Sequence, residues 1–343
     1  MTAPAAVRET IVSRTPGAEV FVLAEDRLAV MFPNFSVTIR GAEHVARSTA
    51  VIDAVGEGRT PDELVERIVE AGSLPEDRAR ATLAELVELG VLCEHASDLD
   101  VDDPVTAYYA YSEPDPASVL ALLAQAPVAL CAPASVATEV REAMARAGVV
   151  GDVLPVETGA ELSRISSELR ALIDATSPEV IACWGFSYRS PLALEVNALA
   201  IEHGKRALFG TVEGAIARIG PFVIPGNTAC LVCAESRILS NAGPDEVDIA
   251  AAYGRRYAGR VAPDGPAHPL FAEAASRLFL LELTSVLTHY GARTVNGFVE
   301  LDTSGADRRF HRVLRVPRCP GCSREAPPRI PWDLTFEPPR RTT

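Results

Sequence analysis

The sequence predicts an α/β protein in which a small winged-helix-like N-terminal unit precedes a larger domain built on a parallel sheet. Short β-type runs and then three helical patterns fill the first part of the chain. Further on, almost continuously apolar strands alternate with helices, which is typical of a parallel sheet covered on both faces. Two Cys-x-x-Cys pairs in the last third indicate that this domain holds a metal ion.

Composition limits the function. The 343 residues suffice for two or three domains, and 48% of them are hydrophobic. A formal net charge of -14 argues against a surface for duplex nucleic acid. Residues 1–14 contain no apolar core of a secretory signal, and no stretch is apolar for long enough to span a membrane. We therefore expect a cytoplasmic protein that binds neither nucleic acid nor membrane.

The N-terminal unit is expected over residues 17–96, after a flexible tail over residues 1–16. Its turn chemistry is clearest at Thr60-Pro61-Asp62-Glu63, where a Thr N-cap, a Pro at the first helical position and a Glu three residues after the cap form a capping box. The predicted elements are strands at 20–23, 28–32 and 35–39, helices at 42–55 and 74–89, a helix between them that opens at Thr60–Glu63 and carries Leu64, Ile68 and Val69, and a further short strand at 91–92.

Residues 97–126 are expected to be a linker with a connecting helix, because Asp98–Pro104 is acidic and ends in proline. The larger domain then runs over residues 127–343. Its predicted strands lie at 127–131, 153–156, 179–184, 207–209 and 310–316, and its predicted helices at 137–147, 162–173, 192–203 and 268–290, with a further segment at 216–224.

The two Cys-x-x-Cys pairs supply four thiolates, which is the ligand set of a structural zinc site. They are Cys230 with Cys233, and Cys319 with Cys322. Because the protein fills all four positions, no position is left for water or substrate, and the zinc is expected to be structural. The alternative is two redox pairs or unlinked buried thiols. The other three cysteines lie in apolar runs and are expected to pack in cores: Cys93, Cys131 and Cys183.

The cysteine motifs resemble those of a known family. Residues 220–233 and 315–322, read as GPFVIPGNTACLVC and RVPRCPGC, resemble the E1-like or ThiF-like fold in its degenerate branch from thiazole/oxazole-modified peptide biosynthesis. The resemblance covers about two-thirds of the chain and implies a Rossmann-type domain that commonly forms a homodimer. The N-terminal unit resembles the precursor-peptide recognition element of this family. The resemblance implies a partner that binds the leader of a ribosomal precursor peptide and presents it to a YcaO-type cyclodehydratase for azoline formation.

The phosphate-binding turn of an active E1-like enzyme is absent from the sequence. The turn after the first strand reads Ala132-Pro133-Ala134-Ser135, where Pro133 has no N–H to donate and no glycine allows close approach of a phosphate. Trp184-Gly185-Phe186 stands where the family places a magnesium-binding Asp. We therefore expect no ATP as cofactor and a non-catalytic subunit. The alternative is an atypical ATP-dependent E1-like enzyme that adenylates a peptide.

Leader binding is expected to occur by strand addition to an open sheet edge. The edge strand would be Phe35–Arg40, and helix residues at 78–86 would line the adjoining groove, although Leu83 and Leu86 could equally be core. The candidate contacts are Phe35, Ser36, Val37, Thr38, Ile39, Arg40, Arg78, Thr82, Leu83 and Leu86. A third interpretation, a winged-helix transcription factor with a zinc-bearing sensor domain, is disfavoured because Asp77, Glu85 and Glu88 on the candidate recognition helix would repel phosphates.

Overall fold

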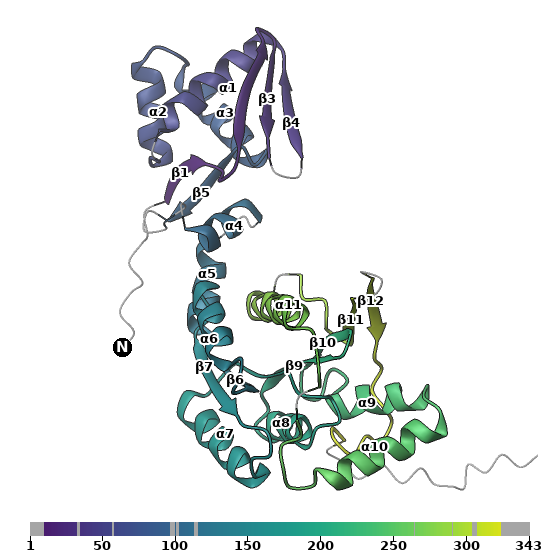
Figure 1. Ribbon diagram of the computed structural model, residues 1–343. Helices are drawn as coiled ribbons and strands as arrows, with labels where there is room; N and C mark the ends of the chain where they lie inside the picture. The colour runs from purple at the N-terminus through teal and green to yellow at the C-terminus, as the bar shows by residue number, and fades with distance from the viewer. Residues whose placement is uncertain are drawn as a thin grey trace, which may run out of the picture. The chain divides into compact units, whose positions relative to one another are not determined.

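The structure is a computed structural model that divides into two compact units, Met1–Leu122 and Leu123–Thr343. It is drawn in Figure 1. It describes residues 10–32, 35–56, 58–96, 100, 103–112, 116–263, 265–289, 291–303 and 307–323. Each unit has a core of its own and is treated separately below.

The first unit combines two small antiparallel sheets with three helices. One sheet has the order β2-β3-β4, and β1 pairs with β5 in the other. The elements are β1 (Thr10–Arg14), β2 (Glu19–Ala24), β3 (Arg27–Met31), β4 (Ser36–Arg40), α1 (Ala42–Val55), α2 (Pro61–Glu70), α3 (Glu76–Glu88), β5 (Leu92–Ala96) and α4 (Pro104–Ser112). Leu28, Ile52, Leu64 and Leu86 meet in a shared core, so the sheet and the helices fold as one body.

The capping box predicted at the start of the second helix is present. The Glu63 N–H donates to the Thr60 hydroxyl at 3.2 Å, and the Thr60 N–H donates to the Glu63 carboxylate at 3.0 Å. These two bonds satisfy N–H groups that the first turn of a helix otherwise leaves without partners.

The prediction of a flexible tail over residues 1–16 is wrong for its last part. Thr10–Arg14 forms β1, which pairs with β5 across about eighty residues of sequence, and Val12 is fully buried. The partner strand is too far away in sequence for a hairpin signal, which explains why sequence patterns miss it. Residues 1–9 lie outside the described residues. The connecting segment also contains two helices rather than one, α4 and α5 (Pro116–Gln125).

The second unit is built on a mixed sheet of seven strands in the order β12-β11-β10-β9-β8-β6-β7. Four strands are parallel: β6 (Val128–Pro133), β7 (Gly151–Val156), β8 (Val180–Trp184) and β9 (Arg206–Glu213). Three antiparallel strands extend the sheet beyond β9: β10 (Ile216–Val223), β11 (Gly297–Asp302) and β12 (Arg308–Arg312). The predicted parallel sheet is therefore right for its first four strands, whereas β11 lies outside the predicted runs.

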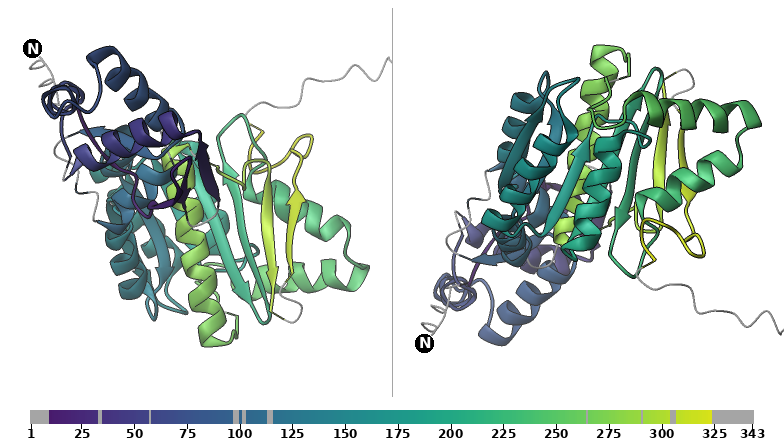
Figure 2. Two further views of the ribbon diagram at one scale, coloured as in Figure 1. Left: turned by 90° about the horizontal axis from the view of Figure 1, so that it is seen from above. Right: turned by 90° about the horizontal axis from the view of Figure 1, so that it is seen from below.

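Helices cover both faces of this sheet (Figure 2). The contacts of α6 (Ala137–Arg146) and α11 (Pro269–Thr288) place these two together, and α7 (Leu162–Thr176), α8 (Pro191–Glu202) and α9 (Leu231–Ser240) form a second group. A further helix, α10 (Pro244–Arg256), has no buried residue. Within the described residues, none of these helices combines the length and the apolar character needed to cross a membrane.

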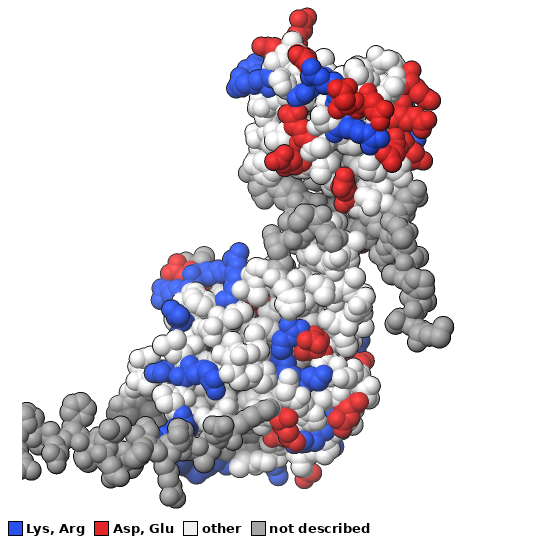
Figure 3. Space-filling model, turned by 180° about the vertical axis from the view of Figure 1, so that it is seen from behind, with Lys and Arg blue, Asp and Glu red and all other residues white. Residues whose placement is uncertain are grey.

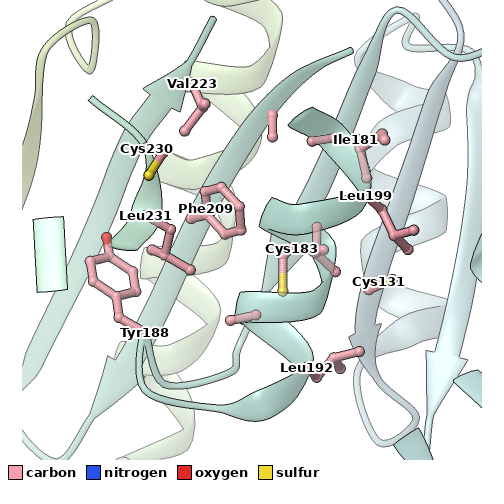
Figure 4. Packing of buried hydrophobic residues seen from close by; sticks show 14 of the residues in the cluster. Cys131, Ile181, Cys183, Tyr188, Leu192, Leu199, Phe209, Val223, Cys230 and Leu231 are labelled. Carbon is pink, nitrogen blue, oxygen red and sulfur yellow. The ribbon is translucent and has the colours of Figure 1, made fainter. Parts of the chain in front are cut away.

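Apolar side chains from β6, β8, β9 and α8 form the core of the second unit, and this core continues to the cysteine motifs. Phe209, Leu199 and Leu231 pack in one cluster with Cys230 (Figure 4). Because the first Cys-x-x-Cys pair begins inside this cluster, the position of its sulfurs is tied to the packing of the sheet.

Candidate metal centre and peptide-binding strand

The first cysteine pair lies at the start of α9. Cys230 is the N-cap residue and Cys233 lies in the first turn. The turn before it is held by Thr228, whose hydroxyl accepts from the Ile224 N–H at 2.7 Å. Asn197 on α8 accepts from the Leu231 N–H at 3.0 Å inside the core. A helix N-terminus favours thiolates, so both sulfurs lie where negative charge is stabilised.

The second pair lies in the loop after β12 and meets the first. Sγ–Sγ distances are 3.8 Å for Cys230 and Cys233, 3.7 Å for Cys230 and Cys319, and 3.7 Å for Cys233 and Cys322. All four sulfurs lie within 4.8 Å of one another. A disulfide needs sulfurs about 2 Å apart, so the four cysteines form a cluster of separate thiols.

This cluster fits a tetrahedral ion. Four thiolates about 2.3 Å from a central ion, the usual zinc–sulfur distance, stand about 3.8 Å from one another. The three Sγ–Sγ distances given above match that spacing. A hydrogen bond from the Cys230 thiol lowers the pKa of Cys233, and the Val316 N–H, 3.3 Å from the Cys233 sulfur, also lowers it. The four predicted ligands are thus brought together, and they could hold a metal ion.

The remaining cysteines are separate from this cluster. Cys131 and Cys183 are buried in the core (Figure 4), and burial raises the pKa of Cys131 to about 12 and that of Cys183 well above its ordinary value. Cys93 is half-buried in the first unit. Thiols with raised pKa values stay protonated at neutral pH, as expected for packing residues.

The ends of β6 and β8, where an E1-like enzyme would hold phosphate and magnesium, are packed with apolar groups. Pro133 is buried, and a Cβ on Gly185 would lie 2.8 Å from its ring. Trp184 is 3% exposed and contacts the ring of Phe279 at a centroid distance of 5.0 Å. Glu157, which follows β7, is exposed.

In the first unit, the strand expected to bind peptide lies at the sheet edge. β4 pairs with β3 on one side only. The Phe32 N–H donates to the Phe35 carbonyl at 2.9 Å, and the Gly41 N–H donates to the Asp26 carbonyl at 2.8 Å. Because hydrogen-bonded pairs alternate along an antiparallel ladder, Val37 and Ile39 bond to β3. The backbone groups of Ser36, Thr38 and Arg40 therefore point to the open side.

The candidate contact side chains divide into two groups. Phe35, Ser36, Thr38, Arg40 and Arg78 are exposed, Val37 is half-buried and Ile39 is buried. Thr82, Leu83 and Leu86 are buried in the core of the unit, which matches the core alternative for the two leucines. Arg78 pairs with Glu43 at 3.2 Å and lines a hollow of about 350 Å³ between the starts of α1 and α3.

Two exposed apolar residues of this sheet, one on β3 beside β4 and one on the far edge strand β2, are absent from the sequence-based set. Phe21 and Met31 are 41% and 47% exposed. The register pairs Phe21 with Ala29 and Ala29 with Thr38, and it pairs Met31 with Ser36, so all of them share one face. Because side chains alternate between the two faces of a strand, the sequence of residues 19–31 could have shown which residues share a face. It could not have shown that this face is exposed to solvent.

Comparisons with known proteins were made for the sequence and for the fold. Neither a family model nor a curated protein sequence matches the chain. Among solved structures, the heterocyclase TruD aligns with a TM-score of 0.70 and 18% identity, over 92% of this chain and 43% of that one. A heterocyclase in complex with substrate and cofactor aligns with a TM-score of 0.67 and 18% identity, over 91% and 39%. This chain therefore spans less than half the length of these two proteins.

A shorter protein aligns over its whole length. The microcin C7 biosynthetic enzyme MccB in complex with N-formylated MccA, a protein of E. coli, matches with a TM-score of 0.59 and 13% identity, over 91% of this chain and 100% of that one. At these identities the likeness is one of fold. The expected likeness of fold is thus confirmed: this chain has the fold shared by TruD and MccB.

Proposed function

We propose that this chain is a non-catalytic scaffold that binds the leader of a ribosomal precursor peptide and presents it to a YcaO-type cyclodehydratase. The first unit, as a winged-helix-like recognition element, would take the leader as an added strand on β4. The second unit would be a degenerate E1-like domain in which a structural zinc ion joins two segments of the chain. A homodimer is part of this proposal by resemblance alone.

The open edge of β4 is the observation that carries the proposal. Ser36, Thr38 and Arg40 offer backbone groups to a new strand, and the exposed Met31 lies beside Ser36 on the same face of the sheet. An unpaired edge of this kind is the usual acceptor for an extended peptide. TruD and the second protein are heterocyclases by their names, and MccB is a biosynthetic enzyme in complex with N-formylated MccA, which supports a precursor peptide as the ligand.

Zinc is proposed because four thiolates at tetrahedral spacing are its preferred structural ligands. Cys230, Cys233 and Cys319 are fully buried and Cys322 is half-buried, so the ion would be covered on most sides by protein. The site would join the C-terminal loop to α9. Its part in the function would be to keep the second unit folded.

A proline at the outward-facing centre of β4 tests the strand mode. Thr38→Pro removes an N–H that points to the open side and leaves the ladder to β3 intact. We expect binding of a labelled precursor peptide, encoded beside this gene, to weaken about tenfold or more, since one bond is lost and its acceptor stays unpaired. Fluorescence anisotropy on the full chain measures this. Ile39→Pro is unsuitable because its N–H bonds to β3.

Thr38→Val is the matched control, because it changes the same side chain and keeps the N–H. Its affinity should stay within about threefold of wild type. If both variants lowered the affinity for the peptide equally, the Thr38 hydroxyl, and not the backbone of the strand edge, would bind the peptide. Peptide-dependent consumption of ATP by the chain alone would instead support the adenylating alternative.

A further inference from the structure

The strand β12 forms one edge of the large sheet, and its outer side has no strand partner among the described residues. The Asp302 N–H donates to the Asp307 carbonyl at 3.1 Å, and the Val313 N–H donates to the Asn296 carbonyl at 2.8 Å. By the alternation of an antiparallel ladder, Arg309 and His311 bond to β11. The backbone groups of Arg308, Phe310 and Arg312 therefore point outward from the sheet edge.

The side chains of the same three residues lie on one face of β12, because they are two residues apart. Together with Arg293 and Val299, Arg308 and Phe310 line a hollow of about 420 Å³. The Phe310 ring is 53% exposed and lies so close over Gly297 that a Cβ there would overlap it. The hollow thus has an apolar floor with two guanidinium groups beside it.

Arg293 is held in this position by a buried carboxylate. One oxygen of Glu282 on α11 accepts from the Arg293 N–H at 2.7 Å, from the Thr294 N–H at 2.8 Å and from the Thr294 hydroxyl at 2.8 Å. Glu282 is 8% exposed. These bonds fix the backbone from which the Arg293 side chain extends, so less freedom is lost when a ligand binds.

Positive charge gathers here in a protein that is acidic as a whole. The net charge of the chain is -14, yet residues 308–318 contain five Arg and no Asp or Glu. Arg309, on the opposite face of the strand, pairs with Asp307 at 3.0 Å. Among the described residues, no carboxylate pairs with Arg293, Arg308 or Arg312. Figure 3 shows Lys and Arg gathered on the side of the second unit where β12 lies.

We propose that the outward face of β12, with Arg293, docks an extended acidic segment of the enzyme that modifies the bound peptide. This inference rests on the proposed function, which requires a separate enzyme. An incoming strand would bond to the backbone of Arg308, Phe310 and Arg312, and alternate carboxylates would meet Arg293, Arg308 and Arg312. The methylene carbons of the middle acidic side chain would lie over the hollow beside Phe310. The free edge selects an extended segment, and the unpaired arginines select an acidic one.

Charge substitutions on the two faces of β12 test the docking surface. We expect the full chain to bind the purified companion cyclodehydratase, and the Arg308→Gln/Arg312→Gln variant to bind it about tenfold more weakly. Arg309→Gln removes a charge from the same strand on the other face, so its affinity should stay within about threefold. A fluorescent peptide of alternating Glu and Val should show the same ranking, and its Gln and Val counterpart should bind at least tenfold more weakly.

Several results would overturn this assignment. They are equal weakening by Arg309→Gln, equal binding of the Gln and Val peptide, and an unchanged affinity of the double variant for the enzyme. A double variant that changes self-association in sedimentation would assign the face to a second copy of the chain. Arginine-dependent binding of a single-stranded oligonucleotide in place of the acidic peptide would assign it to nucleic acid. Leader binding measured in parallel separates the two proposals, because the double variant should retain it.

Discussion

At the residue scale, the metal centre depends on a glycine as much as on its cysteines. A Cβ on Gly321 would lie 2.6 Å from a methyl carbon of Val232 and 3.4 Å from the Cys230 sulfur. Cys319 and Cys322 flank this position, and Val232 stands between Cys230 and Cys233. The two Cys-x-x-Cys turns therefore pack directly on each other, which leaves no room for a side chain at residue 321.

Gly321→Ala should destabilise the second unit and weaken its metal binding. Overpacking of this kind costs about 1–3 kcal/mol. A domain of this size loses roughly 2–4 °C in melting temperature per kcal/mol. Thermal unfolding and a competition titration with a zinc chelator measure the two effects. Gly254→Ala is the control: its Cβ would meet nothing within 4 Å in α10, so the melting temperature should stay equal or rise slightly. An unchanged Gly321→Ala protein would contradict the packing argument.

The sequence identified the four ligands but not what positions them. Two Cys-x-x-Cys motifs are themselves typical of a four-thiolate metal site, so the cluster could be predicted from residue types and spacing alone. The Thr228 hydroxyl and the Asn197 amide act through turns and contacts that form only when α8 meets α9. Contacts between residues so far apart in sequence leave no local pattern.

At the scale of elements, sequence patterns predict those features of helices and strands that depend on residues close together in the chain. The capping box at Thr60 and Glu63 was predicted residue by residue, because its partners are three positions apart. The pairing of β1 with β5 was missed, because it depends on a partner about eighty residues away. The open edge of β4 was predicted, but its outward-facing residues follow from the register with β3. Burial of Thr82, Leu83 and Leu86 likewise follows from packing among the three helices.

Thr60→Ala should lower the stability of α2 against local opening without changing the path of the helix. Loss of the N-cap hydroxyl costs about 1 kcal/mol, which corresponds to roughly fivefold faster hydrogen exchange through local opening of the helix. Hydrogen-exchange mass spectrometry on the full chain resolves this effect to residues 61–70. Glu66→Gln, an exposed change in the same helix, should leave exchange within about twofold. Equal acceleration by both variants would mean that the capping box contributes nothing to the helix.

At the scale of the whole molecule, the two units differ in charge and in what holds them together. Residues 1–122 contain 22 Asp and Glu against 9 Arg, and the remaining 221 residues contain 24 against 23 basic residues. Nearly all of the excess negative charge therefore belongs to the unit proposed to bind the leader. Because the units have separate hydrophobic cores, a metal ion held by the four cysteines would stabilise only the second one directly.

Removal of the metal should therefore affect the two units differently. We expect the purified chain to contain about one equivalent of zinc and Cys319→Ser to contain none, whereas Cys93→Ser, a change in the first unit, should keep it. Chelation should raise hydrogen exchange in α9 and in residues 313–323, because the thiols that join these segments lose their common ion. Leader affinity should stay within about twofold, since β4 belongs to the other core. If leader affinity fell together with zinc content, the ion would be stabilising the peptide-binding unit as well, and the two cores could not be independent.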